Sequence, residues 1–336
     1  MAAAAPVAAA VTLLIVLDRQ RVNRSERAAA DVDLTPITLQ ADVTGVIDLP
    51  TGAGNAADSY VHALDLLEQE RPRFTALAKQ LDEVGVTVTT DTDLECLYPL
   101  LAGTRSLWCR FGDRLPHNEV ETTTDRNRLG GLLDLGRLLA ARSGVAAERG
   151  NVTEAVELAR ALIVFGWHVA GSPIRNRPTT GPAPTRPTAT TKAPTTRAPE
   201  GPPAVSLDAR KTGLTLIRWG AHALANLQEQ IGDGRGADAA TALEDEAGRT
   251  ADALADRRRR MRDSLFLQIR MAREDPDRAF RVRAVTLIGS SLVGARQPIL
   301  VGRGRYRAAR DALGTLSRDP DTDVRAAATQ YLNRLP

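Results

Sequence analysis

The chain has 336 residues, enough for two modest domains that each bury a core. Apolar residues make up 43% of it but aromatic residues only 4%. Any core must therefore consist mainly of Ala, Leu and Val, which favours close-packed helices and argues against a β-sandwich. The net charge of +3 is unevenly spread, with −7 over residues 1–170, +4 over 171–203 and +6 over 204–336. Either the two halves attract each other, or the second half binds an anionic partner.

The chain begins with an uncharged apolar stretch, residues 1–17 (MAAAAPVAAAVTLLIVL), that ends at Asp18. Seventeen residues is the lower limit for a helix that crosses a bilayer. A cleaved signal peptide fits less well, because no basic residue precedes the apolar run and the small residues lie at its start. A buried Ala-rich helix fits poorly with the RQRVNRSER that follows. We predict a single N-terminal membrane anchor.

Two signals conflict on the orientation of this anchor. Four arginines follow the apolar run (Arg19, Arg21, Arg24 and Arg27), and the positive-inside rule would keep the body in the cytoplasm. The Pro/Thr-rich segment described below is typical of extracytoplasmic stalks, and the cysteines Cys96 and Cys109 could form a disulfide outside the cytosol. In the cytosol they would instead be small buried apolar residues. We expect an extracytoplasmic body and leave the orientation open.

A connector over residues 18–54 leads to a helical domain over residues 55–170. Asn55 is a candidate N-cap, and the apolar residues after it recur at helical spacing. A second helix is expected over residues 72–84, followed by a short extended piece over 84–89. Residues 94–108 are expected to be helical in part.

The strongest helical pattern in this domain begins at Leu129. LGGLLDLGRLLAARSGVAAERG predicts one helix, and NVTEAVELARALIVFGWHVA predicts its antiparallel partner. Gly150 would end the first helix and Asn151 would cap the second. The run AAERGNVTEAVELARAL resembles a tetratricopeptide hairpin, with Gly150, Ala155 and Leu162 near the small and packing positions of that repeat. It is a single unit, so we predict a helical hairpin.

The start of the chain has its own resemblance. An apolar N-terminus, a Pro-containing connector and NAADSYVHALDLL (residues 55–67) resemble the start of uncharacterised membrane-anchored helical proteins from high-GC bacteria. That resemblance implies no activity.

Residues 171–206 separate the two halves of the chain with nine prolines, eight threonines and no aromatic residue. Such a segment cannot bury enough apolar surface to offset the entropy of ordering it, and proline removes backbone donors. We predict a disordered linker between two domains. The alternative is an insertion between two helices of one domain.

A second helical domain is predicted over residues 207–336. Helices are expected over 207–231 and 239–261, and the last part contains a repeat. DPDRAFRVRAVTLIGSSL starts at Asp275 and DPDTDVRAAATQYLNRL at Asp319, 44 residues later, while their Val-Arg-Ala triplets lie 42 residues apart. An Asp-Pro-Asp turn followed by Val-Arg and an Ala-rich helix resembles HEAT-type α-repeats. The expected fold class is thus all-α, with helical hairpins and α-solenoid-like repeats.

No catalytic, metal or cofactor motif stands out, and we expect a non-enzymatic protein without a cofactor. The four histidines lie in separate segments without paired-ligand spacing, and two cysteines near His117 do not make a zinc site. Ser290 and Ser291 miss the nucleophile-elbow spacing, and Gly302-Arg303-Gly304 lacks the third glycine of a dinucleotide fingerprint. An enzyme would need a pocket that gathers residues distant in sequence.

One charged feature remains, because residues 278–310 contain eight arginines and no acid. These could be a solvated face, a face docked on the acidic half, or a binding site for nucleic acid, anionic lipid or an acidic protein. Few aromatic residues lie among them, which argues against single-strand nucleic acid. We expect a membrane-tethered interaction or scaffold protein with a protein partner. The alternative is an anion-binding module, with nucleic acid the less favoured ligand. The candidate residues are Arg278, Arg281, Arg283, Arg303, Arg305, Arg307 and Arg310.

Overall fold

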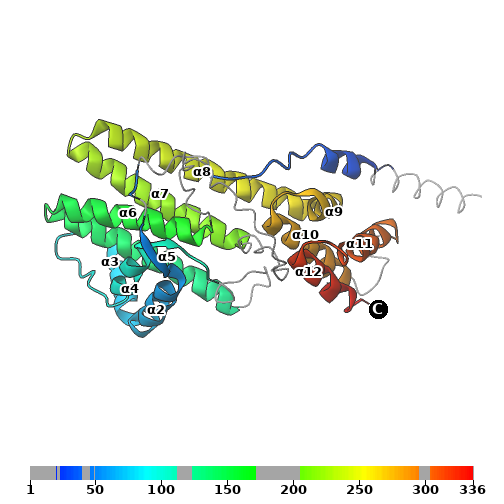
Figure 1. Ribbon diagram of the computed structural model, residues 1–336, viewed down its shortest axis with the longest axis horizontal. Coiled ribbons are helices and arrows are strands. Elements are labelled where there is room, and N and C mark those ends of the chain that lie inside the picture. The colour runs from blue at the N-terminus through cyan, green and yellow to red at the C-terminus, as the bar shows by residue number, and fades with distance from the viewer. Residues whose placement is uncertain are drawn as a thin grey trace, which may run out of the picture. The chain divides into compact units, whose positions relative to one another are not determined.

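The computed structural model describes residues 20, 23–39, 46–48, 50–111, 123–171, 205–294 and 303–335, without the side chains of residues 53, 123–126 and 303. These residues are mostly α-helical, as the sequence predicted (Figure 1). The chain forms two compact units. The larger contains residues 39–251, and the smaller contains residues 1–38 together with 252–336. The helix α8 (Gly234–Asp263) runs from the first into the second.

The larger unit is a bundle of six helices and the first part of α8, with two short strands. In chain order the elements are β1 (Gly52–Asn55), α2 (Ala56–Gln69), α3 (Arg71–Glu83), α4 (Leu97–Thr104), β2 (Ser106–Trp108), α5 (Thr123–Glu148), α6 (Val152–Val169) and α7 (Leu207–Gln230). Helices α5, α6 and α7 pack on one another, and α2 and α4 pack against this group. Its core is built largely from leucine and alanine, as the composition indicated.

The two predicted N-caps in this unit are confirmed, although α5 begins at Thr123, six residues before the predicted Leu129. The Asn55 side chain caps α2 by accepting a hydrogen bond from the Ala57 amide, and Asn151 caps α6 by accepting from the Glu154 amide. Gly150, with φ of +77°, ends α5, and the amides of residues 150 and 151 donate back into its last turn. The predicted hairpin of residues 129–170 is therefore present as α5 and α6.

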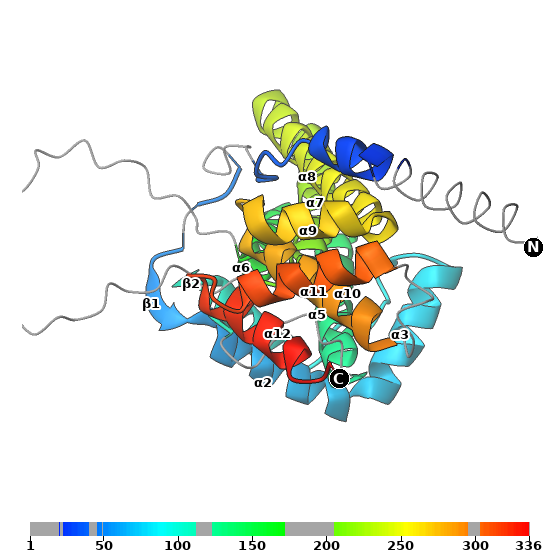
Figure 2. The same ribbon diagram turned by 90° about the vertical axis from the view of Figure 1, so that its right-hand side faces the viewer.

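Glycines allow α6 and α7 to approach until their backbones touch. A Cβ added at Gly166 would lie 2.6 Å from the Gly213 carbonyl oxygen, and one added at Gly213 would lie 2.4 Å from the Gly166 oxygen. Two turns further along, a Cβ on Gly220 would lie 2.9 Å from the Ala159 oxygen. The two helices run side by side in both views (Figures 1 and 2). Only glycine fits at these crossings.

The helices that flank residues 171–206 therefore belong to one unit. The ends of this segment also meet, since a Cβ on Gly171 would lie 2.0 Å from a methyl group of Val205. This arrangement corresponds to an insertion between two helices, the alternative that the sequence left open. The disorder predicted for residues 171–206 concerns positions that lie almost wholly outside the described residues.

A small parallel sheet, which the sequence did not predict, is added to the mostly α-helical fold. Strand β1 pairs with β2, the Gly52 amide donates to the Arg105 carbonyl at 2.9 Å, and a Cβ on Gly52 would lie 2.6 Å from the same oxygen. The sequence placed β1 in a connector and β2 in a partly helical stretch, because strands of four and three residues are too short for a period-2 pattern to show. The extended piece expected over residues 84–89 forms turns and irregular backbone.

The smaller unit contains the end of α8, α9 (Leu265–Glu274), α10 (Arg278–Gly294), α11 (Arg303–Leu316) and α12 (Thr322–Leu332), with a helical segment over residues 23–30. Helices α9 and α10 pack as a pair, as do α11 and α12. The pairs stack through α10 on α12 and α9 on α11 (Figure 2). Phe280 and Val324, 44 residues apart, are both fully buried at the start of their helices.

The predicted membrane anchor, residues 1–17, lies outside the described residues. Within the ranges given above, no helix is both long and apolar enough to cross a bilayer.

Candidate functional site: the arginines of the smaller unit

Two Asp-Pro-Asp turns start the two inner helices of the smaller unit in the same way. The Asp275 carboxylate accepts from the Asp277 amide at 2.8 Å, and Asp277 accepts from the Ala279 amide at 3.0 Å. In the second turn, Asp319 accepts from the Asp321 amide at 2.9 Å, and Asp321 caps α12 by accepting from two amides. The two turns lie 44 residues apart, whereas the Val-Arg-Ala triplets lie 42 residues apart, so the triplets occupy positions in their helices that differ by two residues.

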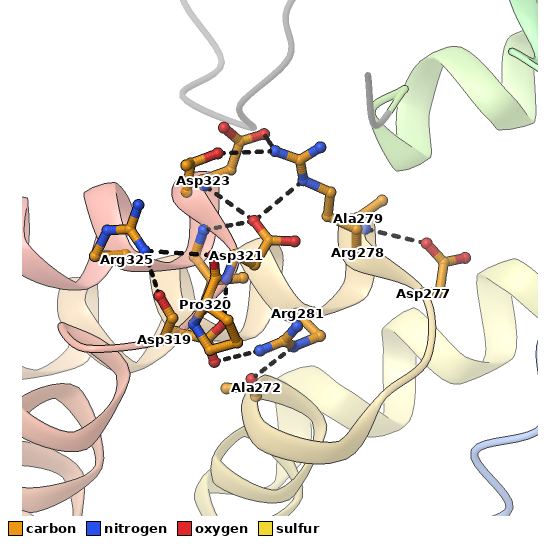
Figure 3. A network of polar contacts seen from close by, with 12 residues as sticks. Ala272, Asp277, Arg278, Ala279, Arg281, Asp319, Pro320, Asp321, Asp323 and Arg325 are labelled. Carbon is orange, nitrogen blue, oxygen red and sulfur yellow. Dashed lines mark hydrogen bonds and ion pairs between the residues drawn. The ribbon is translucent and has the colours of Figure 1, made fainter. Parts of the chain in front are cut away.

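The first two candidate arginines bind the second of these turns (Figure 3). The Arg278 guanidinium lies 3.2 Å from the Asp321 carboxylate and 2.6 Å from that of Asp323, and Arg281 pairs with Asp319. Arg281 also donates to the Ala272 carbonyl at the end of α9. These side chains are largely shielded from solvent, with 28% of Arg278 and 17% of Arg281 exposed. Arg278 and Arg281 therefore join the helix pairs.

The remaining candidates divide by exposure. Arg283 is buried within α10, at 8% exposure. The Arg303 side chain lies outside the described residues. On α11, Arg305 is half-buried, while Arg307 and Arg310 are exposed. Within the described part of the chain these three form no ion pair. The eight-arginine stretch is thus not one surface: its beginning is structural, and α11 carries its accessible charge.

Two further arginines, Arg257 on α8 and Arg270 on α9, hold residues 29–35, which lie more than 200 positions earlier in the sequence. Arg257, 8% exposed, donates to the Asp33 carbonyl at 3.3 Å and to the Thr35 carbonyl at 2.5 Å, and its guanidinium lies over the Phe280 ring. Arg270 donates to the carbonyls of Ala29, Ala30 and Val32 at 2.7–2.8 Å. The contacts are to backbone oxygens, so they fix the path of the segment.

A turn in this segment supports the contacts to Arg257. The Asp33 carboxylate accepts from the hydroxyl and the amide of Thr35, at 2.6 and 2.9 Å. These hydrogen bonds, that from the hydroxyl first, lower the pKa of Asp33 below its ordinary value. The turn brings the carbonyls of residues 33 and 35 onto the same guanidinium.

The sequence did not identify Arg257, although its position carried a signal. It lies inside the run of four arginines at 257–260, where a solvated helix end is the ordinary interpretation. The residues of α8 that are buried recur at alternating spacings of three and four: Ala240, Leu243, Ala247, Thr250, Leu254, Arg257 and Met261. Of the four arginines, only Arg257 continues this apolar stripe.

A cleft of about 450 Å³ opens beside the held segment. Residues 25–32 form one wall, and the end of α8, the start of α9 and Arg305 form the others. Arg260 and Arg305 supply positive charge, Asp263 supplies one negative charge, and the other lining residues are mostly apolar. Ser264 caps α9 at this point by accepting from the Leu267 amide. The lining residues are Ser25, Ala28, Ala29, Val32, Arg260, Asp263, Ser264, Leu265, Phe266, Leu267 and Arg305.

In the larger unit, a second cleft of about 300 Å³ lies where α3, α5 and α7 meet. Its walls are mostly apolar, with Phe74, Leu81, Val86 and Trp219, and Asp82 and Arg137 lie at its edge. No buried polar group points to a ligand class there.

The buried titratable groups of the larger unit form part of its core. Tyr60 Oη lies 2.7 Å from His168 Nδ1, both side chains are buried, and the Tyr60 ring packs against the rings of Phe111 and Phe165. Burial lowers the pKa of His168 to about 4 and raises that of Tyr60 well above its ordinary value. The pair is therefore neutral near pH 7.

Cys96 and Cys109 are free thiols in this structure. Cys96 is buried, and burial raises the pKa of its thiol to about 12; burial also raises the pKa of Cys109. A thiol held in its protonated form is a poor nucleophile and a poor metal ligand. Among the described residues, no three His, Cys, Asp or Glu side chains gather as a metal site would require.

No protein-family model matches this sequence, and neither the curated proteins nor the solved structures contain a significant match.

Proposed function

We propose that this chain is a membrane-tethered, non-enzymatic interaction protein, whose smaller unit is a short HEAT-like stack that binds a protein partner through α11. The observation that carries the proposal is the division of the arginines. Arg278 and Arg281 are engaged with aspartates of the next helix pair, whereas Arg307 and Arg310 are exposed on α11 one turn apart.

The stack-like order supports the repeat interpretation. Helices α9 and α10 form one antiparallel pair, α11 and α12 form the next, and each inner helix starts at an Asp-Pro-Asp cap. Two repeats are fewer than a self-standing stack usually needs. The end of α8 and residues 29–35, held by Arg257 and Arg270, add contacts to the two helix pairs.

The support for the proposed membrane tether is the sequence of residues 1–17. Residues 1–17 form an uncharged apolar run, and the segment that begins a few residues later is fixed to the smaller unit by backbone hydrogen bonds. A membrane anchor at residues 1–17 would hold this unit close to the bilayer.

Quantitative co-purification from detergent-solubilised membranes tests the protein-binding role. The full chain is compared with the double variant Arg307→Ser/Arg310→Ser and with Arg273→Ser, an exposed arginine on α9. The proposal expects one stoichiometric partner that the α11 variant loses and the α9 variant keeps. An identical set of bound proteins for all three chains would contradict it.

The second candidate function is anion binding. The observation that favours it is that Arg305 lines a cleft together with Arg260 and makes no ion pair within the described part of the chain. Binding of an anionic surface would weaken steeply with salt.

A further inference from the structure

The cleft beside residues 25–32 combines features of a site for an anionic amphiphile. Its apolar wall, with Val32, Leu265 and Phe266, could hold hydrocarbon, while Arg305 supplies a guanidinium. Arg260 adds a second guanidinium, although it is already paired with Asp256 at 2.7 Å. Ser25 adds a hydroxyl. Guanidinium groups form strong charge-assisted hydrogen bonds with phosphate oxygens.

The charge of the lining favours a monoanion. Arg260 is paired with Asp256 and the lining also contains Asp263, so among the described residues Arg305 is the one lining cation without an ion pair. A phosphodiester carries one negative charge, whereas free phosphate near pH 7 carries between one and two, and a second charge would face Asp263. The lining therefore suits the phosphodiester of a lipid headgroup better than free phosphate.

The position of the cleft along the chain places it near a bilayer if residues 1–17 are an anchor. Ser25 follows Leu17 by eight residues. Eight residues span at most about 28 Å even when fully extended. Arg257 and Arg270 fix residues 29–35 to the same unit, so the whole lining stays within reach of the headgroups.

We infer that this cleft binds the headgroup of an anionic phospholipid, such as phosphatidylglycerol, with Arg305 on the phosphate and the apolar wall against the glycerol and the first acyl carbons. The inference rests on the membrane attachment in the proposed function and identifies the anion of its second candidate. It moves the anion site away from Arg278, Arg281 and Arg283.

The test is thermal unfolding of the full chain in a mild nonionic detergent, titrated with short-chain phosphatidylglycerol or with phosphatidylcholine. A ligand of the folded state raises the unfolding temperature with concentration, which gives an apparent Kd. Phosphatidylglycerol should stabilise the chain and phosphatidylcholine should not. Inorganic phosphate and glycerol 3-phosphate, at equal concentrations, separate a lipid site from a site for free phosphate.

Two kinds of variant locate the site, each with a matched control. Arg305→Gln should raise the apparent Kd for phosphatidylglycerol about tenfold, because it removes a charge-assisted hydrogen bond. Ala28→Trp, which fills the cleft without changing its charge, should raise it similarly. Arg273→Gln and Ala30→Trp alter exposed residues outside the lining, and both should stay within about twofold of the unaltered chain.

Three results would overturn the inference. Equal stabilisation by both lipids would remove the role of charge, and equal stabilisation by inorganic phosphate would remove the role of the lipid. If Arg305→Gln and Ala28→Trp bind as the unaltered chain does, while Arg307→Ser/Arg310→Ser loses binding, the lipid lies on the exposed face of α11. This result would reject the cleft as the binding site but would leave anion binding as a function of the protein. Loss of partner co-purification is measured separately, so it tests the protein-binding role alone.

Discussion

Two helix interfaces in this protein differ in the residues that form them. In the larger unit, α6 meets α7 through glycines, and backbone atoms of one helix contact those of the other. In the smaller unit, α10 meets α12 with Arg278 and Arg281 engaging three aspartates, while Phe280 and Val324 are buried at the start of their helices.

The difference teaches how each interface depends on sequence. The glycine interface tolerates no added atom at its crossings, but it contains no charge and should be indifferent to salt. The Asp–Arg contacts of the second interface are partly exposed to solvent, so they should weaken in salt. The changes below break one interface at a time.

Gly213→Val should have the largest effect. Its new Cβ would lie 2.4 Å from both the Gly166 oxygen and the Ala170 nitrogen, so α6 and α7 must separate. We expect a loss of at least about 3 kcal/mol in the free energy of unfolding. All three tryptophans lie in the larger unit, so urea unfolding followed by tryptophan fluorescence reports on it.

Gly130→Val is the control for this substitution. A Cβ at Gly130 meets nothing within 4 Å, so only helix propensity changes, by a few tenths of a kcal/mol. Equal losses for both variants would contradict the close-packing account.

Acid should destabilise the larger unit through His168. The folded pKa is about 4 and the ordinary value is 6.5, so between these pH values the unfolded chain binds a proton that the folded chain excludes. Stability is then full above pH 6.5 and falls toward pH 4, by about 2 kcal/mol between pH 7 and 5. The same fluorescence assay at each pH measures this.

The double variant Tyr60→Phe/His168→Phe removes the titrating group together with the hydroxyl that lies 2.7 Å from it, so neither of these two groups is left facing an empty partner. Between pH 7 and 5, the double variant should lose about 2 kcal/mol less stability than the unaltered chain. An unchanged pH dependence would show that other groups cause the acid sensitivity.

Arg281→Ala should cost about 1.5 kcal/mol, because Asp319 loses its partner and the Ala272 carbonyl loses a donor. Half a molar NaCl should reduce this cost, since the pair is partly exposed. Hydrogen exchange of α10 and α12, read by mass spectrometry, measures it locally. Faster hydrogen exchange in α6 and α7, with none in α10 and α12, would contradict a local role of Arg281 between the helix pairs.

Asp277→Ala should have the smallest effect, about 1 kcal/mol, from loss of a helix cap. The expected change is faster exchange confined to the first turn of α10. Asp277→Asn keeps a cap and should restore protection, whereas equal exchange in both variants would argue against capping.

Most local structure could be predicted from the sequence, because caps and periodicity act over a few residues. Asn55, Asn151 and the two Asp-Pro-Asp turns begin helices where their patterns place them. The long-range contacts could not be predicted in the same way. Nothing near Gly52 identifies Ser106 as its partner, and nothing near Thr35 identifies Arg257.

The candidate site shows the same limit. The arginines of residues 278–310 were grouped because they lie close together in the sequence. In the fold they differ in how far they are exposed to solvent. Arg283 is buried, Arg278 and Arg281 are engaged with the next helix pair, and α11 holds the exposed charge. The cleft at Arg305 requires residues 25–32 and α9, which lie about 240 positions apart.

The central claim is that the smaller unit is a membrane-proximal binding module that uses α11. Photo-cross-linking in intact cells tests it most directly, with a photoreactive amino acid placed at Arg307 and, separately, at Arg273 on α9. The account predicts a discrete cross-linked protein in the membrane fraction from position 307 and none from position 273. The same products from both positions, or products from 307 only in the soluble fraction, would contradict it.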